Sequence, residues 1–143
     1  MSTGSPSGQA PGAERMGLQA GMIVMEIGYD DDIDDDLRSS VEDATGEELV
    51  GEDSDEVVDA VLVWYRDGDG DLADLLVDAI APLAESGFIW LLTPKRGRAG
   101  HVEASDIQEA ASIAGLSQTS IATAGPDWSA ARLAGRKSQG PRK

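Results

Sequence analysis

The chain contains no cysteine and a single histidine, His101, among its 143 residues. Without cysteine, disulfides, cysteine-ligated zinc sites and thiol nucleophiles are all excluded. With one histidine, a Ser-His-Asp arrangement could form only around His101, and a histidine-rich metal site is excluded. His101 stands alone in a predicted loop, and we assign it no catalytic role.

Long apolar runs are absent as well. No run approaches the roughly 20 residues that a membrane-spanning helix needs. Residues 1–13 lack the basic start and apolar centre of a signal peptide. We therefore expect a cytoplasmic protein that does not contact a membrane.

Basic residues are scarce in the front half of the chain, and the formal net charge is −16. Between Glu26 and Asp78, 21 acidic residues accompany only two basic ones, Arg38 and Arg66. From Lys95 onward, eight basic residues outnumber four acidic ones. The acidic half repels phosphate groups, so we expect no nucleic-acid binding. The basic end leaves contact with an anion or an acidic partner open.

Apolar runs bounded by glycines or turn residues predict the strands of the domain. Between the first two strands, residues 30–44 predict a helix, because Ile33, Leu37 and Val41 recur at helical spacing. The predicted strands span residues 21–28, 47–50, 57–65, 88–93, 118–124 and 128–133. The last two read as a hairpin around a Gly-Pro-Asp turn.

Two further helices are expected in the second half. One begins at an Asp71 N-cap and carries an apolar stripe as far as Leu83, with Pro82 kinking or ending it. The other is predicted from the capping-box spacing of Ser105 and Gln108.

Strands that alternate with helices through short loops predict a parallel sheet with right-handed crossovers. The expected fold is a small Rossmann-like three-layer α/β sandwich, mostly parallel, with a C-terminal antiparallel hairpin. It should form a single domain over residues 15–134. Residues 1–14 predict a disordered tail and residues 135–143 a flexible basic tail, from their composition.

The edge beyond the carboxyl ends of the strands is where such sheets bind ligands. It should carry residues 29–32, 66–71 and 93–101. The candidate ligand residues are Gly28, Tyr29, Asp30, Asp32, Lys95, Arg96 and Arg98. The three basic residues stand among glycines and fit an anion cradle, or they are surface charges that offset the acidic face.

The turn after the first strand lacks the glycines of a nucleotide-binding loop. Only Gly28 is present, followed by the bulky Tyr29 and by carboxylates that repel a pyrophosphate. A sulfonium cofactor tolerates negative charge better, but the missing glycines still count against it. The sequence therefore predicts no cofactor.

Two acidic motifs imitate metal sites. Asp31, Asp32 and Asp35 have DDxxD spacing, but a second such motif is missing. Residues 67–71 with Asp78 imitate a calcium loop, but the sixth position is not glycine and the twelfth is not glutamate. We interpret the first as a solvated helix N-terminus and the second as a loop leading into a helix cap, and we predict no metal site.

The three tryptophans are expected in different surroundings. Trp64 and Trp90 lie in predicted buried strands and should belong to the core. Trp128 follows the hairpin turn, so we expect it to be partly exposed and the better candidate for partner contact.

Several segments, in order along the chain, resemble the actinobacterial family labelled domain of unknown function 3052. They are Gly17-Leu, Gly21-Met-Ile-Val, Glu26-Ile-Gly-Tyr-Asp-Asp-Asp, Val57-Val-Asp-Ala-Val-Leu, Trp90-Leu-Leu-Thr-Pro-Lys, Gly100-His-Val-Glu, Ala114-Gly-Leu-Ser-Gln-Thr-Ser and Pro126-Asp-Trp-Ser. More distantly, the layout is similar to a shortened class I methyltransferase core with its closing hairpin. That likeness implies an acidic residue at the end of the second strand, which Glu52 or Asp53 would supply.

The interpretation we favour is a non-catalytic acidic binding or regulatory module that presents its acidic face to a protein partner. One alternative is an atypical S-adenosylmethionine-dependent methyltransferase-like enzyme that works at the edge formed by residues 28–32. A second is a protein that binds divalent cations through its aspartates.

Overall fold

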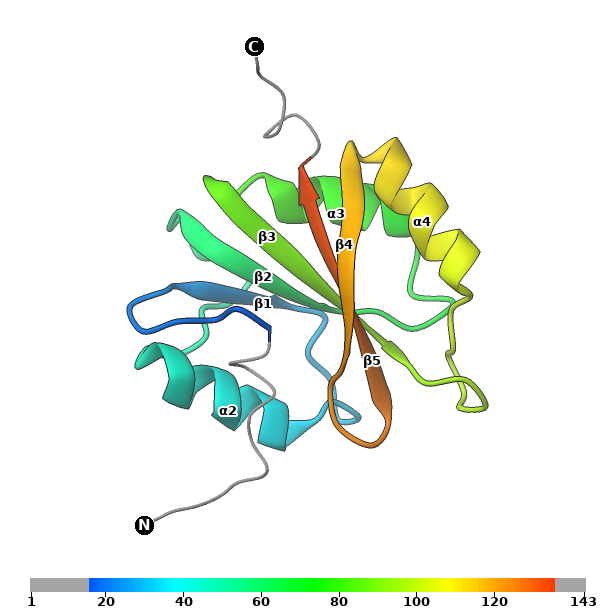
Figure 1. The fold of residues 1–143 in the computed structure, drawn as a ribbon, viewed down its shortest axis with the longest axis horizontal. Helices are drawn as coiled ribbons and strands as arrows, with labels where there is room; N and C mark the ends of the chain where they lie inside the picture. The colour runs from blue at the N-terminus through cyan, green and yellow to red at the C-terminus, as the bar shows by residue number, and fades with distance from the viewer. Residues whose placement is uncertain (1–15, 136–143) are drawn as a thin grey trace.

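A computed structural model describes residues 16–135 as one five-stranded sheet with helices on both faces (Figure 1). The elements in chain order are β1 (Val24–Ile27), α2 (Asp35–Thr45), β2 (Val58–Trp64), α3 (Leu72–Ile80), β3 (Leu83–Pro94), α4 (Ala104–Ile113), β4 (Leu116–Thr123) and β5 (Trp128–Gly135). The predicted tails lie outside the described residues, apart from Gly135, which belongs to β5.

The strand order is β1-β2-β3-β5-β4. β1, β2 and β3 are parallel neighbours, whereas β5 is antiparallel to both β3 and β4. The predicted α/β class, with Rossmann-like parallel strands and a C-terminal antiparallel hairpin, is confirmed. No helix in residues 16–135 has the length and apolar character that crossing a membrane requires.

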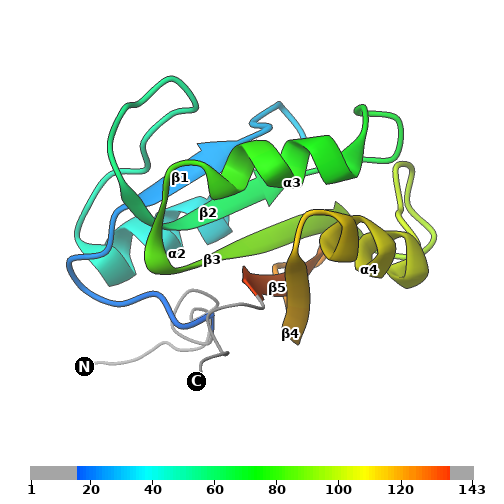
Figure 2. The same ribbon diagram turned by 90° about the horizontal axis from the view of Figure 1, so that it is seen from above.

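Helices cover the two faces of the sheet in separate layers. Figure 2 shows α3 and α4 on one face and α2 on the other. Along β2, Val61 and Val63 face the α3–α4 layer, while Leu62 and Trp64 face α2. Because both faces are covered, this central strand is apolar along most of its length, as the continuous run in the sequence predicted.

The ends of the first two helices follow their capping residues. α2 begins after Asp34, whose Oδ1 accepts a hydrogen bond from the backbone N–H of Leu37, 2.9 Å away. The helix therefore starts five residues later than residue 30, because an aspartate cap fixes the start more strongly than acidic composition does. The predicted Asp71 cap of α3 is confirmed: its Oδ1 accepts from the N–H of Asp74.

Three expectations drawn from the sequence are corrected by the structure. Leu83 is the first residue of β3, since the helix ends before Pro82. Ser105 lies inside α4, whose N-cap is Glu103, so the capping box does not form. Of the strand predicted at residues 47–50, only Val50 pairs, in a single parallel bridge. Apart from this bridge, β1 is the edge strand of the sheet.

Candidate functional site

The carboxyl ends of β1 and β2 lie side by side, with Ile27 opposite Val63. Gly28 follows β1 with a φ of 86°, a conformation that side-chain-bearing residues rarely adopt. A Cβ built on Gly28 would overlap the carbonyl oxygen of Trp64 at the end of β2. Glycine is thus required here by a close approach between two parts of the chain itself.

Arg66 fills the space beyond these two strand ends. Its Nη1 donates to the carbonyl oxygens of Gly28, at 2.9 Å, and Trp64, at 3.1 Å. Its Nε donates to Asp32 Oδ2 at 2.9 Å, and Nη1 lies 3.3 Å from Asp69 Oδ2. Only 15% of this side chain is exposed. One planar guanidinium, with its five N–H donors, therefore joins the loops that follow β1 and β2.

The ionisation of this pair reflects the contact. The hydrogen bond from Arg66, together with its charge, lowers the pKa of Asp32 below the ordinary carboxyl value. The same interaction raises the pKa of the Arg66 guanidinium. Both groups are therefore charged over a wide pH range, and the ion pair between the two loops is kept over that range.

Trp128 completes this corner from β5. It is only 3% exposed, so the prediction that it is a partly exposed partner contact is wrong. Its ring meets Trp64 edge-on with centroids 4.9 Å apart, and its Nε1 donates to the carbonyl oxygen of Asp32 at 3.1 Å. The Arg66 guanidinium lies over the ring, 5.3 Å from its centre. Trp128 is buried because its ring packs against Trp64 and beneath the Arg66 guanidinium, at the start of β5 beside Pro94 of β3.

The second basic residue of the acidic half, Arg38, is also held within the chain. Its Nε donates to Oε2 of the buried Glu26 in β1, at 2.8 Å, and Trp64 Nε1 donates to the same oxygen. The hydrogen bond to Glu26 raises the pKa of Arg38. The guanidinium also lies 4.9 Å from the ring centre of Tyr29, a candidate ligand residue that is 58% exposed. Asp30, a further candidate, is exposed beside it.

Glu52 and Asp53 are the two acidic residues to which the methyltransferase likeness pointed. The bridge between Val50 and Met25 places the following residues beside the β1 loop. There Glu52 Oε2 accepts a hydrogen bond from the backbone N–H of Gly28, at 3.0 Å. The carboxylate thus binds the loop backbone of its own chain. Asp53, the other candidate, is exposed.

The basic candidates Lys95, Arg96 and Arg98 lie in the turn after β3. The backbone N–H of Lys95 donates to the carbonyl oxygen of Asp127, at 2.9 Å. Arg98 Nη1 lies 3.1 Å from Asp127 Oδ1, with both side chains about half exposed, and Arg96 is exposed. This turn is tied to the hairpin, and its role as an anion cradle stays a prediction.

His101 lies at the end of the same segment. Its Nδ1 is 3.0 Å from the carbonyl oxygen of Pro94, and its Nε2 is 3.6 Å from Oε2 of Glu103. A carbonyl oxygen only accepts hydrogen bonds, so Nδ1 carries the proton. The ring therefore holds the segment against the end of β3.

The acidic motifs are used by the fold itself. Asp32 and Asp69 bind Arg66, and Asp71 caps α3. Within residues 16–135, no group of three or more histidine, aspartate or glutamate side chains is placed to hold a metal ion.

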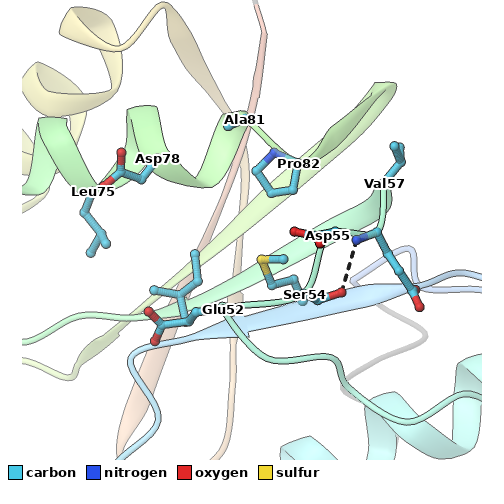
Figure 3. A pocket seen from close by; sticks show the side chains of 11 residues that line it. Glu52, Ser54, Asp55, Val57, Leu75, Asp78, Ala81 and Pro82 are labelled. Atoms are coloured by element: carbon cyan, nitrogen blue, oxygen red, sulfur yellow. Dashed lines mark hydrogen bonds between the residues drawn. The ribbon is translucent and has the colours of Figure 1, made fainter.

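A pocket of about 520 Å³ lies on the α3 face of the sheet (Figure 3). At one end it reaches Ile27, the last residue of β1, and Glu52 beside the predicted edge. It is lined by Met25, Ile27, Glu52, Ser54, Asp55, Glu56, Val57, Leu75, Asp78, Ala81 and Pro82. Sequence reasoning missed this pocket, because it forms only where β1, α3 and residues 51–57 meet. The available signal was the acidic stretch of residues 52–56 without a helical pattern.

Solved structures with a similar fold include methyltransferases. A putative methyltransferase from Thermoplasma acidophilum has a TM-score of 0.59 at 11% identity, over 84% of this chain and 70% of that one. A SAM-dependent methyltransferase from Thiobacillus denitrificans, in complex with S-adenosyl-L-homocysteine, has a TM-score of 0.57 at 11% identity, over 87% and 89% of the chains. At such identities the likeness shows the fold alone.

The residues after β1 do not fit the S-adenosylmethionine that this fold implies. The N–H of Gly28 is taken by Glu52 and its carbonyl oxygen by Arg66. The Gly28 loop packs against the end of β2 too closely to admit even a Cβ. Both backbone polar groups of Gly28 are therefore already paired within the chain.

Sequence comparison gives the family. The chain is 54% identical over 127 residues to an uncharacterized protein of Mycobacterium tuberculosis and to one of Mycobacterium bovis, covering 89% of this chain and 80% of theirs. Residues 13–137 match the model of the family described as protein of unknown function (DUF3052). The predicted family resemblance is therefore confirmed, and the chain belongs to the DUF3052 family, with a methyltransferase-like Rossmann fold.

Proposed function

We propose that this protein is a non-catalytic binding module that presents an acidic surface to a basic segment of a protein partner. The observation that carries the proposal is the position of Arg66. Its guanidinium occupies the space beyond β1 and β2 and binds Gly28, Trp64 and Asp32 from within. In open α/β sheets this is the place where a ligand binds.

The charge distribution supports binding of a basic partner. Arg38 and Arg66 are the two basic residues between Glu26 and Asp78, and both are paired with carboxylates of the same half. With 21 acidic residues and only these two basic ones in the stretch, most of its carboxylates have no basic residue of the same stretch to pair with. A surface of this kind attracts cations, speeds encounter with a cationic partner and repels phosphates.

Calorimetry with S-adenosylmethionine and S-adenosyl-L-homocysteine tests the non-catalytic half of the proposal. We expect no binding heat for either compound at millimolar concentration, with a methyltransferase of known affinity measured alongside as the positive control. Micromolar binding would contradict the proposal. It would support the alternative, a methyltransferase-like enzyme.

A further inference from the structure

The pocket on the α3 face has an apolar floor. Met25 and Ile27 of β1 are buried in the core cluster of this face, and Leu75 of α3 packs against it. Ala81 and Pro82 close the floor where α3 ends (Figure 3). Within the described chain no helix forms between Val50 and β2, so the pocket is open to solvent beside α3 although Met25 and Ile27 at its base are themselves buried.

Carboxylates border this floor on two sides. Asp55 comes from the segment before β2, and Asp78 comes from α3 across the pocket (Figure 3). Glu56, which follows Asp55 in the sequence, also lines the pocket. Glu52, at the β1 end, binds the N–H of Gly28. Within residues 16–135, no ion pair or side-chain hydrogen bond engages the carboxylates of Asp55, Glu56 or Asp78.

We infer that this pocket binds a partner segment in which an apolar side chain is flanked by lysines or arginines. This inference rests on the proposed function and names the site where it acts. The apolar side chain would cover the partly buried Leu75 and the exposed Val57, which favours binding in proportion to the apolar area covered. The flanking cations would meet Asp55, Glu56 and Asp78 in charge-assisted hydrogen bonds.

The size of the pocket fits a side chain and its neighbours better than a folded surface. A volume of about 520 Å³ is within the range of small-ligand pockets and takes one or two large side chains. Val57 stands on its rim with 70% of its surface exposed and extends the apolar area toward solvent. A short basic and apolar peptide segment therefore matches both the shape and the charge.

A fluorescently labelled peptide of leucines and lysines is a suitable probe, with binding followed by anisotropy. Two control peptides separate the contributions: one replaces each leucine with serine, and the other replaces each lysine with glutamate. The pocket variant combines Asp55→Asn, Glu56→Gln and Asp78→Asn. Its charge-matched control combines Asp43→Asn, Glu47→Gln and Glu48→Gln, three exposed residues at and beyond the end of α2.

A third variant, Ala81→Trp, fills the pocket without changing the charge. Ala81 is exposed at the end of α3, so the larger side chain can be accommodated without disturbing the core. Circular dichroism melting of every variant confirms that the fold is kept before binding is measured.

We expect the leucine–lysine peptide to bind the unaltered protein and the two control peptides to bind much more weakly. The pocket variant and Ala81→Trp should each weaken binding of the peptide by about tenfold, while the charge-matched control changes it by about twofold or less. If the pocket variant and its charge-matched control weaken binding equally, the peptide does not bind in the pocket, and the inference is wrong. The proposed function as an acidic binding module would not be contradicted by that result. If the peptide does not bind at all, the proposed function fails together with the pocket.

Discussion

Two acid-rich regions of this molecule differ in how their charges are satisfied. At the carboxyl edge, Asp32 is bound by Arg66, and the backbone groups of Gly28 are taken by Arg66 and Glu52. Around the α3-face pocket, Asp55 and Asp78 border an apolar floor without such partners in the described chain. The difference shows that a position in the fold does not by itself leave groups free for a ligand, whereas exposed carboxylates without a partner in the described chain are free to meet a cation.

The largest expected effect comes from breaking the close approach at the carboxyl edge. Gly28→Ala would force a side chain into a positive φ and against the Trp64 carbonyl, so we expect a loss of at least about 3 kcal/mol in the free energy of unfolding. Gly17→Ala is the matched control, with a φ of 81° and nothing within 4 Å of the added Cβ. It should cost only about 1–2 kcal/mol, the penalty of the left-handed conformation alone. Urea unfolding measures both, and equal losses would contradict a tightly packed edge.

Removing the guanidinium should have the next largest effect. Arg66→Met keeps a long apolar stem but leaves Asp32 and two backbone carbonyls without their donor, so we expect a loss of about 2–3 kcal/mol. Arg98→Met, whose pair with Asp127 is half exposed, should cost no more than about 1 kcal/mol. An Arg66→Met protein as stable as its control would show that Arg66 does not hold the edge together.

The pH dependence of stability tests the contact between Arg66 and Asp32 more specifically. The pKa of Asp32 is lowered in the folded protein, so this group stabilises the fold above its unfolded pKa, near the ordinary 3.8. That contribution is lost as the pH falls through the lower folded pKa. Unfolding measured from neutral to acidic pH should therefore show the gap between the unaltered protein and Asp32→Asn closing in the acidic range. In an Arg66→Met background the gap should be small at every pH, and a persistent gap there would assign the effect to another partner.

The smallest effect is expected at the basic turn. Reversing Arg96 and Arg98 to glutamate should cost no more than about 1 kcal/mol, because both side chains are exposed and the pair with Asp127 is weak. Thermal melting of the double variant gives the answer. A protein that fails to fold would instead make these arginines part of the architecture.

Local patterns were enough to predict much of the fold. The continuous apolar run of β2, the Asp71 cap and the C-terminal hairpin each depend on residues close together in the sequence. The start of α2 was predicted too early because several aspartates are possible N-caps. Only Asp34 accepts the capping hydrogen bond, from the N–H of Leu37.

The site depended on contacts that no local pattern records. Arg66 and Asp32 are 34 residues apart, and they meet only because β1 and β2 are neighbours. Trp128 is buried by Trp64, which lies on a strand from the other half of the chain. Sequence analysis could place Gly28 and Asp32 at one edge, but it could not foresee that Arg66 closes that edge.

One measurement compares the two regions directly. Amide resonances of the isotope-labelled protein can be followed while S-adenosyl-L-homocysteine is added to one sample and the leucine–lysine peptide to another. We predict that the peptide shifts resonances of residues 52–57 and 75–81, and that millimolar S-adenosyl-L-homocysteine leaves those of Gly28, Tyr29 and Glu52 unchanged. Shifts of Gly28, Tyr29 and Glu52 with the cofactor product, and none around the pocket with the peptide, would contradict the account.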